Sequence, residues 1–154
     1  MIRASGDSAI FAEHFSVDDV LGYIQAKLSS IGRSIKKTED VFQNILRGSS
    51  QDFLPLFVKA RSLQVEHSSA IGMVVTKPPE TVCIVLHENG QDLLMFDSHS
   101  RPSLGFSGAN VLKTKSTDAV LHFLVRTFPH FPCDEEAVSL MYNCFECTFF
   151  VYDK

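Results

Sequence analysis

An acidic residue and a histidine stand two positions apart in the segment Phe96-Asp97-Ser98-His99, directly after an apolar run. In a β-strand, side chains two positions apart lie on one face, so Asp97 and His99 are predicted to point the same way. A carboxylate beside an imidazole holds the ring in one tautomer and stabilises its protonated form, as a general base requires. We therefore take Asp97 and His99 as the candidate catalytic residues.

The elements that must position this pair divide between two halves of the chain. The first half, about residues 14–61, has helical signals: apolar residues recur at helical spacing over 17–31 and again over 38–46, ahead of Gly48. Residues 53–60 are a third candidate helix, although their apolar side chains could equally form a buried strand. The sequence therefore predicts a helical N-terminal half.

The second half, about residues 68–154, has strand signals and one helix that begins after the capping residue Ser116. Because short strands joined by tight turns pair in antiparallel fashion, a mainly antiparallel sheet is predicted here. The predicted strands are residues 70–75, 81–87, 93–97, 109–114 and 144–152.

The pair Asn89-Gly90 predicts a two-residue type I′ hairpin turn, because both central positions of that turn need a positive φ. Counting outward from this turn places Cys83 opposite Phe96. Directly opposed residues share a face, so Cys83 is predicted on the face opposite Asp97 and His99, as a buried core thiol.

Composition and charge bound the class of protein. The chain has 154 residues, 45% of them apolar and 21% charged, which predicts one α+β domain over residues 1–154. The formal net charge of −4 argues against nucleic acid or an anionic membrane as the main partner. We find no signal peptide, no apolar run of about 20 residues and no dense cysteine spacing. A cytoplasmic or nuclear protein without a cofactor is predicted.

The order of motifs around the candidate base resembles part of a known protease family. After Asp97 and His99 come a Gly-rich loop at 105–108, a strand and a helix capped at Ser116. This order is similar to the C-terminal part of the papain-like deubiquitinating cysteine protease domain of herpesvirus large tegument proteins and their cellular relatives. The resemblance covers about residues 81–128. It implies a papain-like-protease-related fold, with His99 as the general base and Asp97 as its orienting acid.

The chain departs from this family where the nucleophile lies. The family's nucleophilic cysteine and oxyanion-hole glutamine precede the base, whereas no cysteine precedes Cys83 here. We therefore favour a non-catalytic, pseudo-deubiquitinase interaction or assembly domain in a ubiquitin-linked pathway, with a protein partner for which ubiquitin is a candidate. The alternative is a deubiquitinating thiol protease whose Asp97 and His99 act on a cysteine from a missing N-terminal segment, the chain being a fragment, or from a partner chain.

Four soft ligands form a second constellation, His130 and Cys133 followed by Cys144 and Cys147. Two such pairs could suit tetrahedral zinc. Alternatively, Cys144 and Cys147 belong to the last strand, where residues three apart face opposite ways. We favour the strand, so no metal site is predicted.

Overall fold

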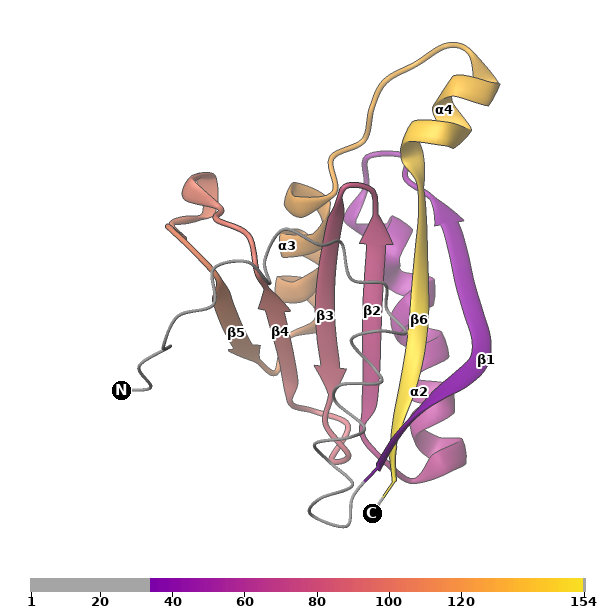
Figure 1. Cartoon of the computed structure of the whole chain (residues 1–154), viewed down its shortest axis with the longest axis vertical. Coiled ribbons are helices and arrows are strands. Elements are labelled where there is room, and N and C mark those ends of the chain that lie inside the picture. The colour runs from indigo at the N-terminus through magenta and orange to yellow at the C-terminus, as the bar shows by residue number, and fades with distance from the viewer. Residues whose placement is uncertain (1–33, 154) are drawn as a thin grey trace, which may run out of the picture. The chain divides into compact units, whose positions relative to one another are not determined.

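A six-stranded sheet organises residues 34–153, the part of the chain that this computed structural model describes (Figure 1). The strand order is β1-β6-β2-β3-β4-β5, and antiparallel ladders connect the last five strands of this order. The strands are β1 Ser34–Ile45, β2 Ile71–Lys77, β3 Glu80–Leu86, β4 Leu93–Asp97, β5 Asn110–Thr114 and β6 Cys144–Asp153. The helices are α2 Leu54–His67, α3 Thr117–Thr127 and α4 Glu136–Asn143, with short 3-10 helices η2 Ser50–Phe53 and η3 Pro102–Leu104.

The hydrophobic core lies between one face of the sheet and helices α2 and α3 (Figure 1). Alternate residues of each central strand are buried, as the two-residue period of a strand requires. In β4 this alternation buries Leu93, Met95 and then Asp97, so the candidate acid ends the core-facing row. Helix α2 covers this face with Leu56, Phe57, Ala60 and Leu63, and α3 with Val120, Leu121, Phe123 and Leu124.

Phenylalanine rings join three elements at one end of the core. Phe53 of η2 is fully buried, and its ring centroid lies 4.8 Å from that of Phe145 in β6 and 6.1 Å from that of Phe128, which follows α3. Each tilted pair of this kind adds about 0.5–1.5 kcal/mol beyond simple burial. Phe53 therefore links η2 to both the sheet and the helical layer.

Residues 38–45 belong to strand β1, so the helix predicted over 38–46 is wrong. Alternate side chains from Thr38 to Asn44 are half-buried, which is the period of a strand. The Phe42 ring lies 6.1 Å from that of Phe145 in β6. The local apolar spacing fits either conformation, and pairing with β6, a hundred residues later in the chain, decides for the strand.

Most of the remaining predicted elements are present. The helix expected over 53–60 is η2 followed by α2, and it continues to His67. Ser116 caps α3 through its hydroxyl, which accepts a hydrogen bond from the amide of Ala119 at 3.2 Å. Helix α4 was not predicted from the sequence. The helix expected over 17–31 lies outside the described residues.

The β3–β4 hairpin has the register that the sequence predicts, with Cys83 opposite Phe96. Its turn is different, because Gly90 has a positive φ of 70° and Asn89 does not. The loop is instead closed by the Asn89 side chain, whose oxygen accepts hydrogen bonds from two backbone amides farther along the loop. The type I′ prediction is wrong, but both turns give the same register.

Candidate functional site

Asp97 lies at the end of β4 with its side chain fully buried. It is paired with Asn110, the first residue of β5, which is also buried. A carboxylate removed from water is costly unless it is paired with a cation or accepts several hydrogen bonds. The contacts around Asp97 show how this requirement is met.

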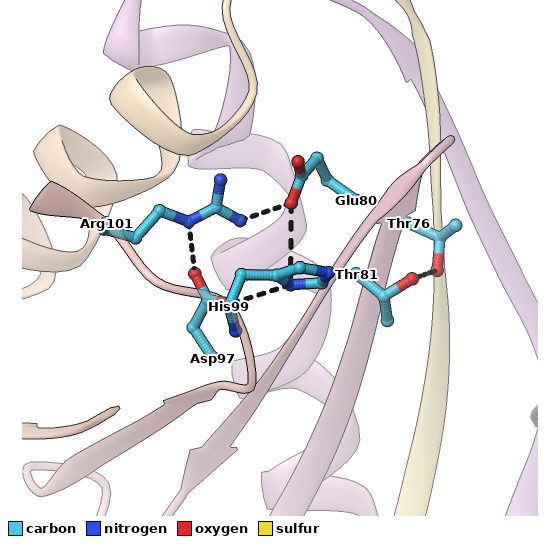
Figure 2. Close-up of polar contacts among 6 residues, drawn as sticks. All are labelled: Thr76, Glu80, Thr81, Asp97, His99 and Arg101. Atoms are coloured by element: carbon cyan, nitrogen blue, oxygen red, sulfur yellow. Dashed lines mark hydrogen bonds and ion pairs between the residues drawn. The ribbon is translucent and has the colours of Figure 1, made fainter. Parts of the chain in front are cut away.

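His99 meets Asp97 through a turn and not through a shared strand face. The strand ends at Asp97, and the backbone amide of His99 donates a hydrogen bond of 2.9 Å to Asp97 Oδ1. The same oxygen lies 3.1 Å from Nδ1 of the imidazole. This contact is drawn in Figure 2. The ring remains 45% exposed. The carboxylate therefore holds Nδ1, while Nε2 has no hydrogen-bond partner among the described residues.

Two further charged residues complete the cluster (Figure 2). Arg101 donates from Nε to the second Asp97 oxygen, Oδ2, at 2.7 Å, and from a terminal nitrogen to Glu80 Oε2. That Glu80 oxygen also lies 3.6 Å from His99 Nδ1. The two carboxylates and one guanidinium carry a net charge of −1, which the imidazolium form of His99 would bring to zero.

These contacts shift two ionisation equilibria. Burial acts to raise the pKa of Asp97, but hydrogen bonds from Arg101 and from the backbone and ring of His99 outweigh it and lower this pKa. Burial acts to lower the pKa of Arg101, but its bonds to Asp97 and Glu80 outweigh burial and raise it. The fully buried Asp97 carboxylate and the partly buried Arg101 guanidinium therefore form an ion pair over the whole neutral range.

Backbone structure holds Arg101 and Glu80 in place. Arg101 forms a β-bridge with Phe106, its amide donating to the Phe106 carbonyl at 2.8 Å, which closes the loop containing η3. Gly105 in this loop has a φ of +85°, a conformation that favours glycine. Glu80 begins β3, next to a cross-strand contact of 3.2 Å between the hydroxyls of Thr76 and Thr81 (Figure 2).

Arg101 and Glu80 were not predicted from the sequence as site residues. Arg101 lies four residues after Asp97, a spacing that has no special meaning in a loop. Glu80 follows a Pro-Pro turn on another strand, 17 positions before Asp97. One physical rule could have pointed to Arg101: a buried carboxylate needs a cation nearby, and Arg101 is the Lys or Arg nearest to Asp97 in the sequence.

No thiol accompanies the candidate base. Cys83 lies on the outer face of the sheet, opposite Phe96 and away from the Asp97 face, as the register predicts. It is half-buried there, so the expectation of a buried core thiol is wrong. Cys147 is the buried cysteine, in β6. Burial raises the pKa of both thiols, which disfavours the nucleophilic thiolate at neutral pH.

The possible zinc ligands are not brought together. Cys144 is exposed and Cys147 is buried, so the two face opposite sides of β6, as the strand interpretation predicts. Within residues 34–153, no three His, Cys, Asp or Glu side chains gather in a way that could hold a metal ion.

A groove lies beside the charged cluster. Its volume is about 320 Å³, and its walls are the β2–β3 turn at 77–80, Arg101, and residues 126–129 at the end of α3. Arg126 and Lys77 add positive charge to this groove, and neither forms an ion pair with another described residue. A ligand could therefore approach Glu80 and Arg101 from outside.

This arrangement can orient an imidazole, but none of the cysteines is hydrogen-bonded to His99 for activation as a nucleophile. Comparison with protein-family models finds no match, and no curated protein matches the chain. Among the described helices, none is long and apolar enough to cross a membrane.

Proposed function

We propose that this domain is a non-catalytic, protease-like interaction module in a ubiquitin-linked pathway. The observation that carries the proposal is the incomplete site: His99 is hydrogen-bonded to Asp97, whereas none of the four cysteines is hydrogen-bonded to His99. A thiol protease needs its thiol within hydrogen-bond reach of the base. The link to ubiquitin rests on the resemblance of residues 81–128 to deubiquitinating proteases.

The ion pairs of Asp97 also favour a structural role for the cluster. One carboxylate oxygen receives the His99 amide and ring, and the other receives Arg101. Arg101 in turn joins Glu80 of β3 to the loop that follows β4. Such a network fixes the loop that contains His99, and a preformed loop lowers the ordering cost of binding a partner.

Incubation with ubiquitin that has a thiol-reactive C-terminus tests the absence of catalysis. The intact mass of the domain is expected to stay unchanged, because no thiol lies beside His99. The exposed thiol of Cys144 serves as the control, because it can react slowly without any activation. Such labelling would disappear in Cys144→Ser and persist in His99→Ala. Labelling that His99→Ala abolishes would contradict the proposal.

Unmodified ubiquitin, added to the ¹⁵N-labelled chain, tests the partner. Backbone amide shifts are expected to move in a saturable way. If no amide moves at millimolar ubiquitin, the link to ubiquitin is wrong.

The alternative function is deubiquitination with a cysteine that another polypeptide supplies. The orientation of His99 favours it, since Asp97 holds Nδ1 and Nε2 is left to accept a thiol proton. The resulting thiolate would attack the isopeptide carbonyl, and the imidazolium stabilised by Asp97 would protonate the leaving lysine amine as the C–N bond breaks. Water, deprotonated by the same imidazole, would then hydrolyse the thioester and release the thiol. The test measures cleavage of ubiquitin conjugates by the assembly that contains this chain, isolated from cells. Cleavage that is lost in His99→Ala and kept in His122→Ala, which replaces an exposed histidine as the control, would establish this function. Equal cleavage by both variants would exclude it.

A further inference from the structure

Helix α4 lies directly before β6 (Figure 1). It carries exposed apolar side chains. Twelve large apolar side chains are exposed in residues 34–153, and four of them fall within residues 131–142. Met141 is 73% exposed. Aromatic residues and methionine are enriched at the centres of protein interfaces. We use the name α4 surface for Phe131, Leu140, Met141 and Tyr142 together with the exposed acidic residues Asp134, Glu135 and Glu136.

The α4 surface is held in one arrangement by a buried asparagine. Asn143 is fully buried; its side-chain oxygen accepts a hydrogen bond of 2.7 Å from the Phe131 amide, and its side-chain nitrogen donates one of 2.9 Å to the Phe131 carbonyl. The Asn143 carbonyl accepts a bond from the Leu46 amide, after β1. The rings of Phe131 and Tyr142 then lie 5.0 Å apart. A surface ordered before binding loses less entropy when a partner docks.

Charge indicates the kind of partner. Residues 127–153 contain no Lys or Arg, while Asp134, Glu135 and Glu136 are exposed at the start of α4. None of these three forms an ion pair with another residue of the described part. A second copy of this chain would bring the same acidic residues together in a symmetric interface, and an anionic membrane would be repelled. A basic rim on the partner is complementary.

We propose that the α4 surface binds a basic amphipathic helix of another protein. The apolar face of that helix packs against Phe131, Met141 and Tyr142, and its flanking Lys and Arg side chains lie against the acidic residues. This is a common mode of helix recognition, with apolar anchors for affinity and charges for orientation. The proposal does not rest on the role of Asp97 and His99 or on ubiquitin.

The test uses the ¹⁵N-labelled full chain and two synthetic 14-residue peptides, one with leucine on one helical face and lysine elsewhere, the other with glutamate in place of lysine. The lysine peptide is expected to shift amides within 131–143, and the glutamate peptide to shift none. The variant Met141→Ser and the double variant Glu135→Lys with Glu136→Lys should each raise the Kd about tenfold.

The control variant is Val111→Ser, which removes an apolar side chain of similar exposure on the outer face of the sheet. Its Kd should equal that of the unmodified chain. All altered positions are exposed, and thermal unfolding of each variant verifies the fold. Shifts centred on the outer sheet face, or equal binding of both peptides, would overturn the proposal.

Discussion

Replacing Arg101 by methionine is expected to lower the free energy of unfolding by about 3–5 kcal/mol at pH 7, the usual effect of leaving a buried charge without its ion-pair partner. The fully buried Asp97 would keep its charge and lose the cation that its Oδ2 contacts at 2.7 Å. Glu80 would lose the same partner. Urea unfolding at pH 7 measures the effect.

The size of this loss should depend on pH in a defined direction. In the native chain the folded-state pKa of Asp97 is lowered, so its stabilisation is fully present above the unfolded pKa of about 3.9 and is lost as the pH falls through the lowered value. Without Arg101, the largest of the influences that lower this pKa is lost, so the pKa of Asp97 rises above its native value. As the pH falls, Asp97 in the variant takes up a proton and the cost of its unpaired charge decreases. The difference in free energy of unfolding between the two proteins should therefore be smaller at pH 4 than at pH 7.

Arg126→Met is the matched control for Arg101→Met. Arg126 is exposed, lines the same groove and forms no ion pair with another described residue. Its replacement should change the free energy of unfolding by no more than about 0.5 kcal/mol. Equal effects of the two substitutions, or an Arg101→Met effect that is the same at both pH values, would show that Arg101 does not compensate a buried charge.

Replacing Phe53 by alanine is expected to lower the free energy of unfolding by about 4 kcal/mol. The ring is fully buried and contacts those of Phe128 and Phe145, so its removal leaves a cavity between η2, β6 and the end of α3. Because a domain of this size is stable by only about 5–15 kcal/mol, a large part of the native stability would be lost. Chemical denaturation at pH 7 measures the change.

Phe96→Ala removes the same atoms from a different environment. Phe96 lies on the outer face of the sheet and is 46% exposed, so its loss should change the free energy of unfolding by less than about 1.5 kcal/mol. Phe53→Leu, which refills most of the space, should lie between the two alanine variants. If Phe53→Ala and Phe96→Ala had equal effects, Phe53 would not be the centre of the aromatic core.

The sequence alone determined the parts of the fold whose causes are local. Alternation of apolar residues located β3 and β4 within one residue of their bounds, since a strand with one buried face repeats every two residues. The loop around Asn89-Gly90 set the register of their pairing. Ser116 marked the start of α3, because a hydroxyl at that position satisfies a free backbone amide of the first turn.

The tertiary structure decided whatever depended on residues far apart in the chain. Residues 38–45 have an apolar spacing that fits either a helix or a strand, and a long-range neighbour, β6, selected the strand. The proximity of Asp97 and His99 was predicted, but their link to Arg101 and Glu80 required the β2–β3 turn to pack beside the end of β4. Sequence spacing shows which side chains share a helix or strand. The neighbours of a buried charge depend instead on how the elements pack, because a charge removed from water must be compensated by an opposite charge or by hydrogen bonds.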